Sequence, residues 1–269
     1  MKGTVGEIRE KLPEISDRSL RGLAKDERAG VRDLASRELA RRRAEREHAA
    51  AEAERVACML NYERPLWQSG LLVAGCDEVG TGPLAGPVVA AAVILPAGTS
   101  IAGIDDSKKL DAPTRERLAV EIRACAVAFS IASCDVEIID RLNIYHAALE
   151  AMRRAVTGLT AAPQHVLVDA RRVPGLSCQQ TPIVKGDSLS QSIAAAAILA
   201  KVHRDDLMLR YSEQYPGYGF HSHKGYSAPE HFAALDKLGP CAIHRRSFAP
   251  VAERLGLRPS PSAQLALGL

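Results

Sequence analysis

The chain has few aromatic residues, no zinc-type cysteine spacing and no long apolar run. Aromatic residues make up 4% of its 269 residues, and a single one is Trp. None of the six cysteines forms a CxxC pair, so we expect reduced thiols in a cytoplasmic protein. Apolar runs such as residues 193–200 fall far short of the ~20 residues that span a bilayer. The first residues, MKGTVGEIREKL, contain no signal-peptide core. The sequence therefore predicts a soluble protein without a membrane segment.

Strong charge of one sign is also missing. Lys and Arg exceed Asp and Glu by only three, giving a net charge of +3. This balance is compatible with a phosphate-bearing partner but does not require one, because proteins that bind by charge alone are usually more basic. Hydrophobic residues make up 46% of the chain and charged residues 25%, which predicts a packed core and excludes wholesale disorder.

The composition changes along the chain and predicts three regions. The first sixty or so residues are rich in Ala, Arg and Glu, with Glu and Arg three or four apart, which favours exposed helix. Because acids nearly balance bases there, we favour a solvated helical appendage over a basic nucleic-acid arm. Residues 61–70 contain Pro65 and Gly70 and are typical of a linker. We therefore expect a helical extension and linker over residues 1–70, a catalytic domain over 71–255 and a tail over 256–269.

The main region predicts a mixed α/β sheet flanked by helices. Short runs of β-branched and small residues bounded by Gly or Pro predict strands at LLVAGCDE, PVVAAAVILP, VAFSIASC, HVLVDA and TPIVKG. Apolar periodicity predicts helices over residues 137–159, 189–211 and 229–238, the last with Ser227 as its N-cap. Three adjacent strands followed by alternating helices and strands indicate a mixed sheet.

The segment CDEVGTGPLAGP places Asp77 and Glu78 at the end of a predicted strand. Its glycines invite comparison with a dinucleotide-binding loop, but their spacing is wrong, and prolines stand where a phosphate-binding helix should begin. We expect a loop that joins two strands. Two adjacent acids at the end of a buried strand are costly unless something positive compensates them. Because side chains alternate along a strand, both can reach one metal only if the chain turns there. The alternative is an ordinary acidic strand end.

Later acids favour a metal site. Asp169 ends the predicted strand HVLVDA, in the same position as Asp77. The Ala-rich helix that follows must pack against the sheet and carries Asp205 and Asp206, of which helical spacing does not decide the inward one. Carboxylates that converge from separate segments form a hard-cation site suited to Mg²⁺ or Mn²⁺.

Taken together, six segments resemble bacterial ribonuclease HII over nearly the full chain. They occur in family order at family-like intervals: GCDEVGTGPLAGPVVAAAVILP, DDSKKL, HVLVDA, VKGDSLSQSIAAAAILAKVHRD, YPGYGFHSHKGY and GPCAIHRRSFAPV. The leading segment through NYERPLWQSG resembles the amino-terminal extension of the longer family members. The combination is highly specific, whereas DEVG or HKGY alone would be weak.

This resemblance implies an RNase H-like fold and an endonuclease. The implied enzyme cuts the RNA strand of RNA–DNA hybrids and cuts at ribonucleotides embedded in DNA. The family's catalytic and metal-binding acids fall on Asp77, Glu78, Asp169 and Asp205, and its junction tyrosine falls on Tyr226, whose ring packs against the sugar after the ribonucleotide. The implied mechanism uses two ions, Mn²⁺ or Mg²⁺, and leaves 5′-phosphate and 3′-hydroxyl ends. The implied partners are the hybrid and ribonucleotide-containing DNA, and we expect a monomer.

The remaining expected substrate contacts lie around the acids. Phosphate contacts are expected at Ser107, Lys108, Lys185 and Lys224, although any one of these lysines can instead be a solvated surface charge. Close backbone approach at Gly80, Thr81 and Gly82 would let main-chain groups bond the 2′-hydroxyl that distinguishes RNA from DNA.

The chain departs from the family at Thr81, where the usual residue is arginine. Threonine keeps the backbone geometry but removes a planar cation. The string DEVGTG is similar to the related ribonuclease HIII group, so we hypothesise weaker cutting at a lone ribonucleotide with longer hybrids still cut. Two further hypotheses are a non-catalytic hybrid-binding protein, whose mark would be loss of an acid, and a metal phosphatase or phosphodiesterase that acts on small substrates.

Overall fold

The computed structural model describes residues 4–257 of the chain. Backbone contacts divide it into two compact units with their boundary between Arg55 and Val56. Residues 258–269, which make up most of the tail expected from the sequence, lie outside the described residues.

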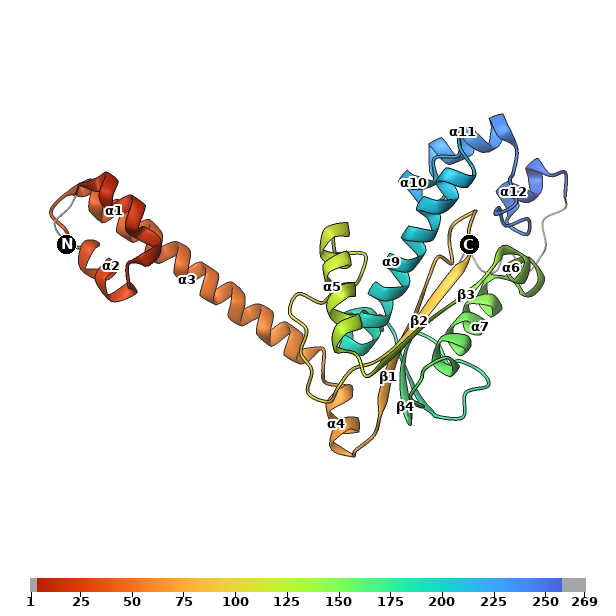
Figure 1. The fold of residues 1–269 in the computed structure, drawn as a ribbon, viewed down its shortest axis with the longest axis horizontal. Helices are drawn as coiled ribbons and strands as arrows, with labels where there is room; N and C mark the ends of the chain where they lie inside the picture. The colour runs from red at the N-terminus through yellow and green to blue at the C-terminus, as the bar shows by residue number, and fades with distance from the viewer. Residues whose placement is uncertain (1–3, 258–269) are drawn as a thin grey trace. The chain divides into compact units, whose positions relative to one another are not determined.

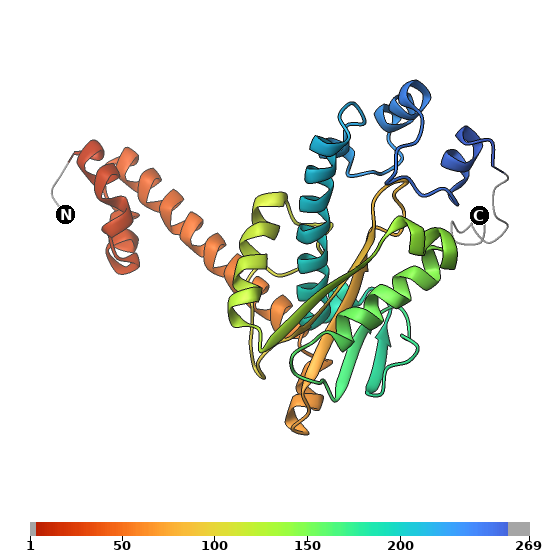
Figure 2. The same cartoon turned by 45° about the vertical axis from the view of Figure 1, so that its right-hand side comes forward.

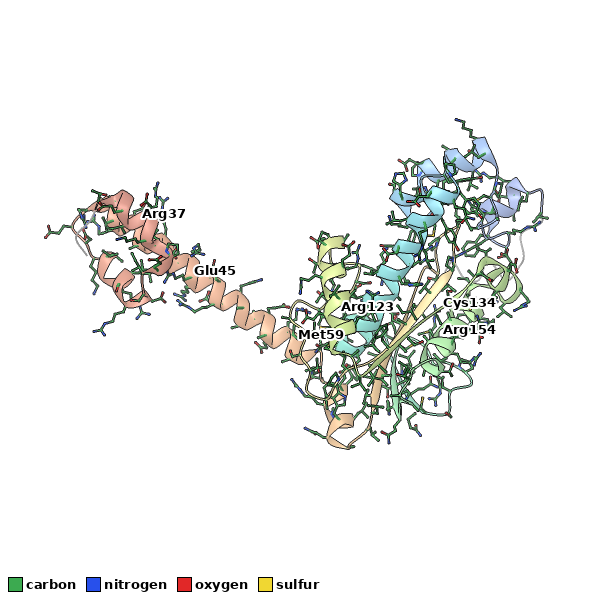
Figure 3. All side chains as sticks on the ribbon, viewed as in Figure 1. Arg37, Glu45, Met59, Arg123, Cys134 and Arg154 are labelled. Atoms are coloured by element: carbon green, nitrogen blue, oxygen red, sulfur yellow. The ribbon has the colours of Figure 1, made fainter. Side chains whose placement is uncertain are left out.

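The first unit is helical, as the sequence predicts. It contains α1 (Val5–Lys11), the short 3₁₀ helix η1 (Leu12–Glu14), α2 (Asp17–Leu23) and most of α3 (Ala29–Cys58). A small core of buried apolar residues, including Ile8, Leu20 and Val31, joins these helices. Charged side chains such as Arg37 and Glu45 stand along α3 (Figure 3), and many form ion pairs three or four residues apart. The repeated Glu and Arg therefore support an exposed helix.

The expected linker contains a helix instead. Helix α4 (Glu63–Gln68) occupies most of residues 61–70. Glu63 is fully buried, and its carboxylate accepts hydrogen bonds from the hydroxyl of Ser190 at 2.6 Å and the backbone N–H of Ser192 at 3.0 Å. Pro65 does not prevent this helix because it sits in the first turn of α4, where proline is tolerated.

The second unit is built on a five-stranded mixed sheet (Figure 1). Its strands are β1 (Val73–Val79), β2 (Val88–Ile94), β3 (Ala128–Cys134), β4 (His165–Asp169) and β5 (Gln179–Ile183), in the order β3-β2-β1-β4-β5. Strands β1, β2 and β3 are antiparallel neighbours, while β4 and β5 run parallel to β1. The loop after Asp77 and Glu78 joins two antiparallel strands, as expected from its glycines and prolines.

Helices cover both faces of this sheet (Figures 1 and 2). Helix α9 (Gln191–Gln214) packs on β1 and β2 together with α5 (Ala112–Cys125), and α7 (Ile144–Thr157) packs on the opposite face. The contact of α9 is so close that a Cβ on Gly75 would lie 2.0 Å from the backbone of Ser192. The Ala-rich helix therefore packs on the central strand, as its lack of polar residues indicates.

Other helix boundaries differ from the prediction. The single helix expected over residues 137–159 is two, α6 (Val136–Leu142) and α7, because Asn143 has φ 69° and caps α7 by accepting from the N–H of His146. Helix α11 (Pro229–Leu238) is found where expected, but its N-cap is Ala228, not Ser227. The short helices α8 (Gly186–Leu189), α10 (Phe220–His223) and α12 (Ala249–Arg254) and the longer α5 were not predicted.

Within residues 4–257, the helices are all too short or too polar to cross a membrane.

Candidate active site

Parallel pairing of β1 and β4 brings two of the expected acids together. Cys76 pairs with Val168, so the next residues, Asp77 two positions before the end of β1 and Asp169 at the end of β4, lie at the same end of neighbouring strands. The backbone N–H of Gly186 donates to Oδ1 of Asp169 at 2.7 Å and fixes that carboxylate. The register of a parallel pair thus juxtaposes residues that are far apart in sequence.

Asp77 and Glu78 do not lie at a turn, contrary to expectation. Strand β1 keeps its regular pairing with β2 through Val79, so the two side chains leave opposite faces of the strand. Asp77 projects towards the face covered by α9, and its Oδ1 accepts from the backbone N–H of Glu78 at 2.7 Å. Both acids nevertheless line one cavity of about 350 Å³, which also reaches Val79 and Tyr226.

The acids have too little compensating positive charge. Burial raises the pKa of Asp77 well above its usual value, and the nearby carboxylates of Glu78 and Asp169 raise it further. Burial also raises the pKa of Glu78, and Arg171 opposes this effect from 3.5 Å. Oε2 of Glu78 is buried and has no hydrogen-bond partner among the described residues. A buried oxygen without a partner beside like charges is costly, and a bound cation would relieve that cost.

Asp205 approaches from α9 and is held by cations. Its Oδ1 accepts from Nζ of Lys201 at 2.7 Å, and its Oδ2 lies 4.0 Å from the guanidinium of Arg115. Lys201 and Arg115 line the same cavity as Asp77. The neighbouring Asp206 is exposed. The structure therefore turns Asp205, not Asp206, towards the cavity residues, a choice that helical spacing left open.

Two of the four expected phosphate-contact residues line the cavity. Ser107, which is buried, and Lys108 line the cavity, and Nζ of Lys108 lies 3.3 Å from a carboxylate oxygen of Asp187. Lys185 is exposed at the start of α8 and is not among the residues that line the cavity. Lys224 lies before Tyr226 in left-handed conformation, and its amino group donates to the carbonyl of His221.

The loop after Glu78 contains three expected contacts and places one of them, Gly82, beside Tyr226. Gly80 has φ 85°, and a Cβ there would lie 2.2 Å from Nε of Arg204, so the fold itself requires glycine. Gly82 differs, because its φ lies outside the left-handed region and its Cβ would meet only the ring of Tyr226, at 3.8 Å. Gly82 and Tyr226 are exposed and Thr81 is half-buried. The loop therefore presents its backbone next to an accessible aromatic ring.

A chain of buried histidines holds the backbone of Tyr226. Nδ1 of His231 lies 2.8 Å from the carbonyl oxygen of Tyr226, and its Nε2 lies 3.0 Å from Nε2 of His244. Nδ1 of His244 accepts from the backbone N–H of Cys241 at 2.9 Å. Each ring nitrogen has a suitable partner when both rings are neutral: Nε2–H of His244 donates to Nε2 of His231, and Nδ1–H of His231 donates to the carbonyl of Tyr226. Burial accordingly lowers the pKa of both, that of His244 to about 4.

Sequence reasoning missed several residues at this site. Asp187 contributes to the raised pKa of Asp77, and Arg115 and Lys201 line the cavity. Arg115 belongs to α5, which was not predicted, while Asp187 and Lys201 stand in motifs that were noticed without a role being assigned. A single charge in a polar segment gives no pattern from which its neighbours in space can be read.

Comparison with known families identifies both parts of the chain. A family model described as "Ribonuclease HII" matches residues 74–251, and one described as "Ribonuclease HII N-terminal domain" matches residues 4–67. A ribonuclease HII from Anaeromyxobacter sp. (strain Fw109-5) is 54% identical over 261 residues, covering 95% of this chain and 82% of the relative. One from Desulfitobacterium hafniense (strain Y51) is 46% identical over 263 residues, covering 96% of this chain and all of the relative.

Solved structures show the same fold. Ribonuclease H2 from Pyrococcus horikoshii OT3 aligns with a TM-score of 0.58 at 22% identity, over 73% of this chain and 99% of that one. The RNase HII of Archaeoglobus fulgidus, solved in a complex with PCNA, aligns with a TM-score of 0.56 at 26% identity, over 65% and 94%. The mixed sheet and its flanking helices are therefore those of an RNase H-like domain.

Proposed function

Because the chain belongs to the ribonuclease HII family, we propose that it is a metal-dependent endonuclease that hydrolyses the RNA strand of RNA–DNA hybrids and cuts at ribonucleotides embedded in duplex DNA. The observation that carries this proposal is the pair of buried, under-compensated acids Asp77 and Glu78, which lie next to Asp169 and line a cavity together with basic side chains and Tyr226. Acids favour a cation, and the basic rim favours a phosphate.

The donor set fits Mg²⁺ or Mn²⁺, held by Asp77, Glu78, Asp169 and Asp205. All four supply carboxylate oxygens, and Oε2 of Glu78, which has no hydrogen-bond partner among the described residues, is available to coordinate a metal. Across residues 4–257 no three His, Cys, Asp or Glu side chains lie close enough together to hold a metal ion by themselves, so water and substrate oxygens would have to complete the coordination. An open arrangement suits Mg²⁺, which usually takes one or two protein carboxylates and completes its shell with waters and substrate phosphates. When bound, two such ions would activate the attacking water and stabilise the leaving 3′ oxygen, giving 5′-phosphate and 3′-hydroxyl ends.

The surrounding side chains position the acids and the substrate. Lys201 and Arg115 orient Asp205 in the absence of metal, and their charges also face the cavity that the scissile phosphate would enter. Lys108 is mostly exposed but tethered to Asp187, which holds its ammonium near the acids. We assign phosphate binding to Lys108 with Ser107 and leave Lys185 and Lys224 as outer contacts.

The loop and Tyr226 would select the substrate. The exposed ring of Tyr226 offers a face on which a sugar can pack, and Gly82 leaves room in front of that ring. Main-chain groups of residues 80–82 would bond the 2′-hydroxyl that DNA lacks. Ribonucleotide recognition is thus assigned to backbone groups and a ring, with no base-specific contact.

Thr81 motivates a second candidate specificity. Its short side chain cannot supply the planar cation that the family usually has at this position, so cutting at a lone ribonucleotide should be weaker than cutting of a long hybrid. Rates on these two substrates, compared for wild type and Thr81→Arg in Mg²⁺ and in Mn²⁺, test this. An unchanged ratio in the variant would show that residue 81 does not set the preference.

Loss of cleavage with binding retained distinguishes the enzyme from a hybrid-binding protein. Asp77→Asn and Asp169→Asn should each abolish metal-dependent cutting of a labelled RNA–DNA hybrid, while its affinity measured in EDTA stays within a few-fold. A matched control is Asp206→Asn, because that exposed neighbour of Asp205 lies outside the assigned ligand set. Wild-type protein that leaves both hybrid and ribonucleotide-containing duplex intact in either metal would refute the proposal.

A further inference from the structure

Two arginines are fully buried without an acidic partner. Arg204 on α9 and Arg245 before α12 have no exposed surface, and neither forms an ion pair with an acid in the part of the chain that the structure describes. Burial lowers the pKa of both guanidiniums, and Arg204 lowers that of Arg245 further. Because arginine stays protonated in proteins, both charges are retained inside the fold, at a cost that apolar residues would avoid.

The hydrogen bonds of both guanidiniums go to backbone carbonyls of two segments. Arg204 donates to Ala85 and Lys224 at 3.1 Å and to Pro87 at 3.0 Å. Arg245 donates to the carbonyls of the loop itself, at 2.5 Å for Gly80, 2.9 Å for Thr81 and 3.0 Å for Gly86. The guanidiniums thereby fix the loop over residues 80–87 and tie it to the residue two before Tyr226.

The bonds made by Arg245 also determine where two backbone N–H groups point. The carbonyl of Gly80 shares a peptide unit with the N–H of Thr81, and the carbonyl of Thr81 shares one with the N–H of Gly82. In a trans peptide the C=O and N–H point in opposite directions, and the described residues contain no cis peptide. Drawing both carbonyls inward to Arg245 therefore turns both N–H groups outward, and a cation at the carbonyl end makes each N–H a stronger donor.

These N–H groups have no internal acceptor. Neither the N–H of Thr81 nor that of Gly82 donates to any atom of the described chain, whereas Leu84 and Gly86 in the same loop do bond internally. Gly82 is exposed, and it faces Tyr226. The pair is thus left for an oxygen-bearing ligand in front of the tyrosine ring.

We propose that Arg245 is a positioning residue for ribose recognition, which holds the Thr81 and Gly82 amides towards the sugar and phosphate oxygens of the substrate. Arg204 keeps Tyr226 in register with those amides through the carbonyl of Lys224. This inference rests on the proposed nuclease function. It deepens that function by assigning the discrimination of ribose from deoxyribose to a buried cation that never touches the substrate.

The test compares Arg245→Lys, which keeps the charge and loses the fork, with wild type. We expect the preference for a duplex with one ribonucleotide over the same all-DNA duplex, measured by fluorescence anisotropy in EDTA, to fall about tenfold. A matched control is Arg42→Lys in the first unit, where Arg42 likewise donates to carbonyls, those of Leu12, Pro13 and Ile15. This control should leave the preference unchanged. A folded Arg245→Lys with wild-type preference and cutting rate would overturn the proposal.

A second measurement needs no variant and stands if Arg245→Lys fails to fold. Hydrogen exchange of the wild-type amides of Thr81 and Gly82 should slow several-fold on binding the ribonucleotide-containing duplex and less on binding all-DNA duplex. Equal exchange with both duplexes would overturn the assignment. Failure of the nuclease function is seen separately, as absence of metal-dependent cutting by wild type, so the two outcomes are not confused.

Discussion

Two glycines of one loop should respond to alanine in opposite ways. In Gly80→Ala the new side chain must adopt a left-handed backbone, which costs ~1–2 kcal/mol. It also meets Nε of Arg204 at 2.2 Å, and that side chain is held by its bond to Pro87, so overpacking adds ~1–3 kcal/mol. The free energy of unfolding should therefore fall by ~2–5 kcal/mol, and the melting temperature by roughly 5–15 °C for a domain of this size.

In Gly82→Ala neither cost arises, because φ is ordinary and the nearest atom is Cε1 of Tyr226 at 3.8 Å. Stability should stay within ~0.5 kcal/mol of wild type. The added methyl group nevertheless occupies the space in front of Tyr226 that we assign to the ribose, so kcat/KM on a ribonucleotide-containing duplex should fall about tenfold or more.

Circular-dichroism melts and cleavage of a labelled duplex measure the two effects on the same samples. Full activity in Gly82→Ala would refute the close approach of substrate to this loop. Wild-type stability in Gly80→Ala would refute the steric reasoning at that position and would show that Arg204 can yield.

Two further predictions concern stability and pH. Asp77→Asn removes a buried charge repelled by Glu78 and Asp169, so the metal-free protein should melt a few degrees higher, by ~1 kcal/mol, while stabilisation by added Mg²⁺ shrinks. A lower melting temperature for Asp77→Asn would contradict that expectation. Since the pKa of Asp77 is raised on folding, the free energy of unfolding of metal-free wild type should also decrease as the pH rises above about 4, and that of the variant should decrease less. The pKa of His244 is lowered to about 4 in the folded protein. The stabilisation that the neutral, buried ring gives to the fold is therefore complete above about pH 6.5 and is lost as the pH falls towards 4. Melts between these values should show the loss in wild type and a flatter profile in His244→Asn, and parallel profiles would count against the histidine chain.

Patterns that depend on neighbours in sequence were predicted well. The apolar runs located β1 to β4 within a few residues and most of β5, and the Ala-rich stretch located α9. The placement of Asp169 at the end of β4 was also readable, because an acid directly after an apolar run marks where a strand ends, whereas Asp77 is buried within β1, which continues to Val79. The family resemblance then indicated Asp205, which the structure turns to the cavity residues through its pair with Lys201.

Features that depend on distant contacts were not readable. Glu63 reads as an ordinary polar residue of a linker, yet it is buried by contacts with Ser190 and Ser192 more than a hundred residues away. Arg204 and Arg245 likewise read as surface charges, because nothing local marks a guanidinium that will bond carbonyls elsewhere in the fold. The assignment of metal-binding roles to the four acids stays a prediction that the proposed variants test.

The loop over residues 80–87 emerges early from the ribosome. Arg245, which hydrogen-bonds the carbonyls of Gly80 and Gly86, is synthesised 165 and 159 residues after them. Contacts this distant in sequence form late in folding, since a long stretch of chain must be ordered before they are made. Asp205 is synthesised forty residues before Arg245, so all four acids exist before Arg245 can hold the loop to which we assign ribose recognition. A nascent or truncated chain would then carry the acids of a nuclease without its means of choosing ribose. Competence to select a substrate would arise only once synthesis is nearly finished.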